Sequence, residues 1–254
     1  MRTLRLASAL LAATVFTIVP ASAIIWSGPD GDRHPYVGMA LFTVEGQLSH
    51  LCSGTLLSPT VLLTAGHCTA DTDGAFVTFD SEVDFATSPF VFGVPHTHPD
   101  FGSGFPNTRD VGVVELGTDV VMSRYGTLPA IGAIDALATR RGHSDQLFTI
   151  VGYGDQAIIP FPAWQPVRYF GTPQVVTLDS ALTGGFNIHL SGNPGQRAPG
   201  GACFGDSGGP ALIGDSDVVG GVGSLVLNRN CVGASLYYRV DTADAQQFVL
   251  DFLQ

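Results

Sequence analysis

Short apolar segments, each ended by Gly, Pro, Asp or Ser, recur along almost the whole chain and constrain its fold more than any other feature. With 32 glycines and 16 prolines in 254 residues, the sequence has turn signals at short intervals. This rhythm is typical of an all-β sandwich or barrel. The segments expected to form strands are 36–43, 54–64, 75–79, 90–94, 111–116, 147–152, 174–178, 186–190, 210–213, 218–227 and 235–240.

The strand rhythm is interrupted once, by a stretch of scattered polar residues that we interpret as a crossover between two halves. The predicted order is a first half at about 36–116, a crossover at about 117–144 and a second half at about 145–240. A short amphipathic helix is expected over about 242–253, because apolar residues recur there at helical spacing after a Thr242 cap.

The first 23 residues have the features of a secretory signal peptide. A basic start with Arg2 and Arg5 precedes an apolar run, and Ala21-Ser22-Ala23 is a small-x-small cleavage site. A membrane anchor, the alternative, needs about 20 apolar residues, more than this run provides. We therefore expect a secreted, extracellular protein of residues 24–254.

Charge argues against two classes of partner. The whole chain has 11 basic and 22 acidic residues, and the signal peptide holds two of the arginines and no acid. The mature chain thus carries 9 basic against 22 acidic residues, a formal charge of −13. We expect no nucleic-acid partner and, after signal removal, no membrane partner.

The four cysteines fall into an early and a late pair, which in an exported chain indicates disulfides. Three connectivities exist, and proximity favours Cys52 with Cys68 and Cys203 with Cys231. Each bond would stabilise the fold by about 3 kcal/mol in the chain-entropy model. A zinc site is disfavoured because no C-x-x-C spacing is present.

The segment from Cys203 to Pro210 places one hydroxyl, Ser207, among three glycines. A serine becomes a nucleophile only when a base removes its proton and donors stabilise the oxyanion that forms. The pattern also fits the nucleophile elbow of α/β-hydrolases, whose histidine follows the serine. No histidine follows Ser207, so any base lies upstream.

Two upstream residues can serve this serine. His67 ends an apolar segment beside Cys68, and Asp110 comes immediately before the strongly apolar segment 111–116. A carboxylate that enters a buried strand is costly without a partner, so Asp110 should be paired. Each residue alone is more simply explained as structural, but together with Ser207 they complete a base and an orienting acid.

The order His, Asp, Ser and three local motifs resemble the trypsin/chymotrypsin-type secreted serine proteases. The matching motifs are Thr64-Ala65-Gly66-His67-Cys68, Asp110-Val111-Gly112-Val113-Val114-Glu115-Leu116 and Gly205-Asp206-Ser207-Gly208-Gly209-Pro210. The resemblance implies two six-stranded antiparallel β-barrels with the active site between them. It also implies a serine endopeptidase that forms an acyl-enzyme through His67, Asp110 and Ser207.

The same resemblance assigns supporting residues. The N–H groups of Gly205 and Ser207 would form the oxyanion hole, and Ser224 would support Asp110. In the family, a new N-terminal isoleucine pairs with the aspartate before the nucleophile, here Asp206. Cleavage after Ala23 exposes Ile24 directly, so signal removal itself would activate the enzyme, although the two usual glycines at mature positions three and four are absent.

The residues implied to bind the side chain before the scissile bond are Gly201, Ser224, Leu225, Val226 and Ser235. Gly201 stands where trypsin-like members have an aspartate, which argues against an Arg- or Lys-directed pocket. Val226 and Ser235 stand where open pockets have glycine. We expect a preference for small or medium apolar residues.

Other candidates have simpler explanations. His96 and His98 could suggest a metal site, but a loop role is favoured, and calcium in the acidic turns 71–73 and 80–82 remains an alternative. We expect no metal, no cofactor and a monomer, with a protein or peptide substrate and a protein inhibitor as partners. A secreted esterase with the same triad and a protease-fold binding protein without turnover are the alternative functions.

Overall fold

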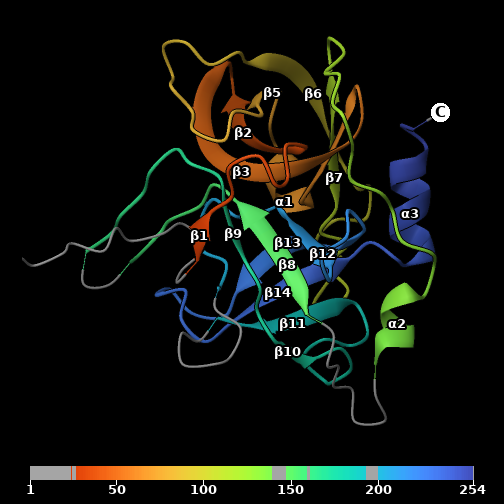
Figure 1. Cartoon of the computed structure of the whole chain (residues 1–254). Helices are drawn as coiled ribbons and strands as arrows, with labels where there is room; N and C mark the ends of the chain where they lie inside the picture. The colour runs from red at the N-terminus through yellow and green to blue at the C-terminus, as the bar shows by residue number, and fades with distance from the viewer. Residues whose placement is uncertain (1–23, 25–26, 139–146, 159–160, 193–199, 254) are drawn as a thin grey trace, which may run out of the picture.

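The computed structural model describes residues 24, 27–138, 147–158, 161–192 and 200–253. Their strands form two units, an upper closed barrel and a lower curled sheet in the view of Figure 1. None of the helices in these ranges has the length and apolar character to cross a membrane. The predicted all-β class and short C-terminal helix are confirmed. Of the two six-stranded barrels expected, the first is a closed six-stranded barrel and the second is a curled eight-stranded sheet.

The first unit is a barrel closed by six antiparallel strands in the order β2-β3-β4-β7-β6-β5. Closure removes exposed strand edges and lets apolar side chains fill the interior, among them the buried Leu56, Leu62 and Val113. The strands are β2 Val37–Val44, β3 Gln47–Ser58, β4 Val61–Thr64, β5 Gly74–Thr78, β6 Val91–Thr97 and β7 Gly112–Leu116.

The predicted strand 54–64 is two strands. A turn at residues 59 and 60 separates β3 from β4, which pair with Leu56 opposite Leu62. β3 also begins at Gln47, because a tight turn with positive φ at Glu45 and Gly46 returns the chain from β2. The first residues of β3 are exposed, so hydrophobic alternation could not reveal them.

The second unit is an eight-stranded sheet in the order β1-β9-β8-β12-β13-β14-β11-β10. β9 pairs with β8 and β10 pairs with β11, while residues 172–174 alone separate β9 from β10. These two short strands therefore act as one interrupted strand that curls the sheet toward closure. The strands are β1 Gly28–Pro29, β8 Phe148–Gly152, β9 Tyr169–Gly171, β10 Val175–Thr177, β11 Asn187–Ser191, β12 Pro210–Ile213, β13 Val219–Val226 and β14 Ala234–Arg239.

The described part of the chain also contains three helices: α1 Gly66–Thr69, α2 Ala133–Leu137 and α3 Ala243–Leu250. α2 lies in the stretch expected to be irregular, and α1 is a single turn after β4. α3 has the expected cap, since the Thr242 hydroxyl accepts a hydrogen bond from the Ala245 N–H. Its Ala245 and Val249 are buried in the cluster that also fills the first barrel.

The histidines of segment 96–98 pack against this helix. The rings of His96 and Phe252 lie 4.7 Å apart, and those of His98 and Phe248 lie 5.1 Å apart. His98 also lies 3.6 Å from the carboxylate of Asp244. Both side chains thus take part in docking α3 on the first barrel.

Candidate active site

His67 and Asp110 are brought together by the pairing of β4 with β7. Thr64 at the end of β4 lies opposite Gly112 at the start of β7, so the residues that flank these ends are neighbours. The His67 backbone N–H donates to Asp110 Oδ1 at 2.7 Å, and His67 Nδ1 lies 2.8 Å from Asp110 Oδ2. The carboxylate therefore fixes both the backbone and the ring of His67, and it engages Nδ1 rather than Nε2.

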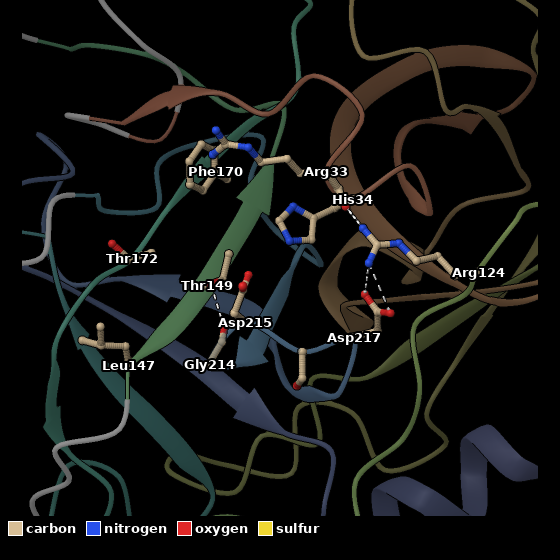
Figure 2. Close-up of a pocket in the computed structure, with 11 residues that line it drawn as sticks. Arg33, His34, Arg124, Leu147, Thr149, Phe170, Thr172, Gly214, Asp215 and Asp217 are labelled. Carbon is tan, nitrogen blue, oxygen red and sulfur yellow. Dashed lines mark hydrogen bonds and ion pairs between the residues drawn. The ribbon is translucent and has the colours of Figure 1, made fainter.

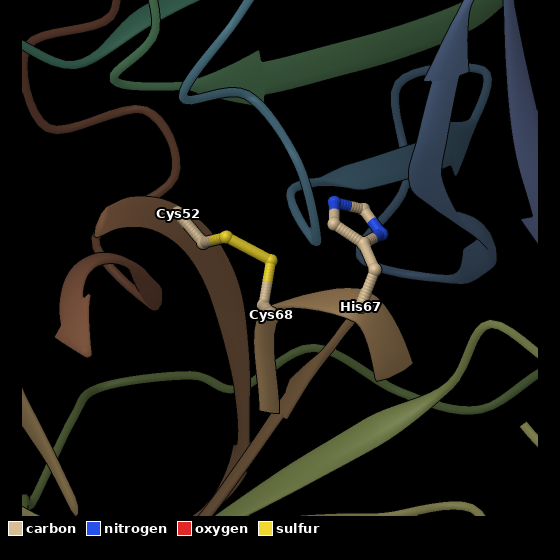
Figure 3. Close-up of side chains that lie close together, drawn as sticks. All are labelled: Cys52, His67 and Cys68. Atoms are coloured by element: carbon tan, nitrogen blue, oxygen red, sulfur yellow. A yellow bond between two sulfur atoms is a disulfide. The ribbon is translucent and has the colours of Figure 1, made fainter. Parts of the chain in front are cut away.

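The Cys52–Cys68 disulfide lies beside the ring of His67 and ties α1 to β3 (Figure 3). One ligand-type atom of each of the three residues lies within 4.8 Å of the others. The sulfur atoms are bonded to each other, so they are not the thiolates that a metal requires. The second bond joins Cys203 to Cys231, which completes the pairing expected from sequence proximity.

Asp110 is also held from the second unit. The Ser224 hydroxyl, on β13, donates to Asp110 Oδ2 at 2.5 Å. Only 5% of the Asp110 side chain is exposed, and a buried carboxylate is costly unless it is hydrogen-bonded. Donors from both units therefore hold the Asp110 carboxyl group in place beside His67.

Ser207 lies in the turn between Cys203 and β12, where glycine is required. Gly205 has φ +96°, and a Cβ added there would lie 2.8 Å from the Cα of Gly154. The Gly208 N–H donates to the carbonyl of Gly223 at 2.8 Å, which ties the turn to β13. Over the described ranges, the N–H groups of Gly205 and Ser207 donate to no protein acceptor.

A cavity of about 190 Å³ brings the predicted residues together. Val226 of β13 lies opposite Ser235 of β14, and Ser235 is buried with no hydrogen-bond partner for its hydroxyl. Between the described side chains of Ser207 and His67 no hydrogen bond is formed, as is common in sites without substrate. The lining residues are His67, Ala202, Cys203, Phe204, Asp206, Ser207, Gly223, Ser224, Leu225, Val226, Ser235 and Leu236.

Gly201 is the predicted pocket residue that does not line this cavity. It packs against Gly192, and a Cβ added to Gly201 would lie 2.6 Å from the Gly192 Cα. A side chain at Gly201 would therefore require the Gly192 backbone to move. The lining of the cavity includes the other four predicted pocket residues but not Gly201.

Asp206 points away from Ser207 into the protein. Its carboxylate accepts the N–H of Gly154 at 2.8 Å and that of Cys203 at 2.9 Å. Burial raises the pKa of this carboxyl to about 7, although the two N–H groups oppose the shift. Ile24 is fully buried in the apolar cluster that includes Ala202 and Tyr237. Burial raises the pKa of Tyr237, and the charge of Asp206 raises it further.

Sequence reasoning missed five residues around this site. Ala202, Phe204, Gly223 and Leu236 line the cavity, and Ser53 bonds to the backbone of the Ser207 turn. The sequence offered a signal for Phe204, because it is an aromatic residue directly before Gly205. In the structure its side chain is exposed beside the turn. Ser53 had only its place beside Cys52 as a signal.

A larger cavity of about 1010 Å³ lies elsewhere and contains none of the predicted site residues (Figure 2). Arg33 lies over the Phe170 ring, and Arg124 pairs with Asp217 at 3.2 Å. His34 faces this cavity while its Nδ1 contacts Asp30 at 2.6 Å. Among the lining residues that the structure describes, no serine is paired with a base. Size alone therefore does not identify the reactive site.

Comparison with known proteins agrees with this geometry. The family model described as Trypsin matches residues 25–245. A solved structure named HL collagenase is 20% identical, with a TM-score of 0.67, over 87% of this chain and 94% of its own. A structure named GrC is 17% identical, with a TM-score of 0.69, over 91% of this chain and 99% of its own. At these identities the two structures indicate a shared fold.

Proposed function

The chain belongs to the trypsin family and is a serine endopeptidase, and on that premise we propose that Ser207 is its nucleophile, His67 its general base and Asp110 the acid that orients His67. The observation that carries the proposal is the 2.8 Å contact of His67 Nδ1 with Asp110 Oδ2, together with the cavity that His67 shares with Ser207. Because Nδ1 is engaged, Nε2 is the nitrogen left to accept the hydroxyl proton.

In the proposed reaction the Ser207 oxygen attacks the peptide carbonyl while His67 takes its proton. His67 then gives the proton to the leaving amine, and an acyl-enzyme remains on Ser207 until water hydrolyses it. Asp110 stays ionised and stabilises the charged imidazole. Its bond from Ser224 supports this role, because a donor to the carboxylate holds it in position.

The oxyanion that forms at each step needs donors in place before the reaction. We assign this role to the N–H groups of Gly205 and Ser207. The support is that both lie in the same turn as the nucleophile and that neither is used by an acceptor within the described residues. Loss of one such donor costs on the order of 100- to 1000-fold in rate in other enzymes.

For specificity we propose a small or medium apolar side chain before the scissile bond. Val226 and Ser235 face each other across β13 and β14 and line the cavity, so both reduce its depth. Leu225 adds an apolar wall, and among the described residues that line the cavity Asp206 alone is acidic. Because the Asp206 carboxylate bonds to Cys203 and Gly154, we expect no preference for Arg or Lys.

We propose that the mature enzyme begins at Ile24 and is secreted as a monomer that acts on protein or peptide substrates and meets a protein inhibitor. The ammonium group of Ile24 would then pair with Asp206. Burial of Ile24 in the cluster that includes Ala202 and Tyr237 supports this pairing, as does the burial of the Asp206 carboxylate, because a buried charge is costly unless it is paired. Signal removal would thereby complete the site around Ser207.

A peptide-library cleavage profile of the mature protein tests the function and its specificity together. We expect cleavage after small or medium apolar residues, with a loss of roughly 10⁴-fold or more in kcat for Ser207→Ala and for His67→Ala. Ser216→Ala is the matched control, since this exposed serine lies outside the Ser207 cavity. Preferred cleavage after Arg or Lys would contradict the specificity, and hydrolysis of esters without peptides would favour the esterase alternative.

A further inference from the structure

Ser53, on β3 of the first barrel, bonds to both residues to which we assign the oxyanion hole. Its N–H donates to the carbonyl oxygen of Ser207 at 2.8 Å, and its hydroxyl donates to the carbonyl oxygen of Gly205 at 2.9 Å. Ser53 is completely buried, so water does not compete for these bonds. One residue of the first unit thus holds the reactive turn of the second unit at two points.

The direction of the Ser53 hydroxyl is fixed by a third bond. The N–H of Tyr153, directly after β8, donates to Ser53 Oγ at 3.0 Å. Since Oγ accepts this bond, its single hydrogen is free to point at Gly205. A Cβ added to Gly152 would lie 3.1 Å from Ser53 Oγ, so the surrounding backbone is closely packed.

Ser53 is also linked to the strand that leads to His67. The hydroxyl of Thr64 donates to the Ser53 carbonyl at 2.9 Å, and Thr64 comes three residues before His67. A Cβ added to Gly208 would lie 2.5 Å from that carbonyl oxygen. Ser53 therefore joins the segments before His67 and around Ser207 through bonds that leave little room for movement.

We propose that Ser53 is a positioning residue, which sets the orientation of the oxyanion donors and the placement of Ser207 relative to His67. This inference rests on the function proposed above. Gly205 has φ +96° and no side chain, so rotation of its backbone is otherwise easy. The bond from Ser53 to its carbonyl restrains that rotation, and electrostatic stabilisation of the oxyanion depends on donors held in one place.

The test compares wild type with Ser53→Ala and Ser53→Gly, which remove the hydroxyl and keep the N–H. Rates are expressed per serine that reacts with a fluorophosphonate, so unfolded protein does not count. We expect kcat for a peptide amide to fall roughly 10-fold or more, with KM within about twofold. Affinity for a peptide aldehyde, which forms a tetrahedral adduct, should fall by a similar factor, while affinity for the matching alcohol should not change.

Thr55→Val is the matched control, because Thr55 lies on the same strand, is completely buried and has a hydroxyl without a partner. Its kcat should equal that of wild type. If neither Ser53 variant folds, Thr64→Val is used instead, because it removes the hydrogen bond to the Ser53 carbonyl. We expect its kcat to fall severalfold. An unchanged kcat would contradict the inference.

Two failures can be told apart. A folded wild type that does not react with fluorophosphonate would overturn the proposed function. If wild type turns over normally but the Ser53 variants keep kcat within about twofold of wild type, only the role of Ser53 is overturned. The same holds if these variants lose activity through KM alone.

Discussion

The hydroxyl of Ser224 lies 2.5 Å from Oδ2 of Asp110, the carboxylate oxygen that also contacts His67. Ser224 belongs to β13 of the second unit, whereas Asp110 precedes β7 of the first. This bond therefore crosses the boundary between the units and satisfies a carboxylate that would be costly to bury alone. The acid that orients His67 depends on both halves of the molecule.

Replacement of Ser224 by alanine should lower activity without abolishing it. Asp110 keeps its two bonds to His67, so the imidazole stays oriented but less rigidly. We expect kcat to fall about 10- to 150-fold, the rate equivalent of the roughly 1.5–3 kcal/mol that one hydrogen bond to a charged group contributes. Steady-state kinetics on a peptide amide check this, with Ser216→Ala as an unaffected control. A loss equal to that of Ser207→Ala would show that Ser224 does more than support Asp110.

The substitution Val226→Gly should widen the cavity and change substrate preference. Val226 lies opposite Ser235, and both line the 190 Å³ cavity, so removal of the branched side chain lengthens the space available to a substrate. The ratio of kcat/KM for a substrate with Phe before the scissile bond to that for Ala should rise about 10-fold or more. Val232→Ala, on an exposed residue outside the cavity, is the control. An unchanged ratio would place the specificity elsewhere.

Stability should fall between about pH 4 and 7 before signal removal, and this fall should be absent after it. Burial raises the pKa of Asp206 to about 7, above about 3.9 in an unfolded chain. Between these values the folded precursor holds a proton that the unfolded chain has released, so its stability falls as pH rises from about 4 to 7. In the mature chain the Ile24 ammonium would pair with the carboxylate and remove this loss.

Urea unfolding of the mature chain and of a chain with a retained N-terminal extension measures this difference. At pH 8 the mature chain should be more stable by on the order of 4 kcal/mol, about three pKa units, and the two should converge near pH 4. Equal pH profiles for the two chains would contradict the pairing of Ile24 with Asp206.

A buried ion pair near the N-terminus should contribute strongly to stability. Asp30 accepts from Arg168 Nε at 2.9 Å and from His34, and the Arg168 side chain is completely buried. Although burial opposes it, these partners hold the pKa of Asp30 below its usual value. Asp30→Asn leaves a buried guanidinium uncompensated and should cost about 3–5 kcal/mol in the free energy of unfolding. Asp244→Asn, which breaks the exposed pair with Arg109, should cost under about 1 kcal/mol, and equal losses would contradict this account.

Much of the fold could be predicted because its strands have strong local signals. Apolar runs such as 111–116 and 210–213 match β7 and β12 within a residue. β9 and the start of β3 escaped prediction for a physical reason. β9 has three residues, too few to show a pattern, and β3 begins with exposed side chains held only by backbone pairing. Pairing of this kind depends on neighbours in space rather than on residue type.

In the candidate site, too, residues with local sequence signals could be predicted and residues that act through backbone contacts could not. His67, Asp110 and Ser207 have distinctive neighbours in sequence, and the structure places His67 with Asp110 and in one cavity with Ser207. Ser53 has no such signal, because its hydroxyl acts on a backbone carbonyl more than 100 residues away. Gly201 was expected at the cavity, but the close approach of Gly192 takes it out of the lining. Contacts between backbones cannot be read from residue type alone.

Stoichiometric labelling with a fluorophosphonate measures whether Ser207 is a nucleophile that His67 activates. The mature protein should lose all peptidase activity as one equivalent is incorporated, and peptide mapping should find the adduct on Ser207. His67→Ala should react at least about 100-fold more slowly, because the hydroxyl then lacks its base. An adduct on another residue, or an unlabelled Ser207 in fully active protein, would contradict the account.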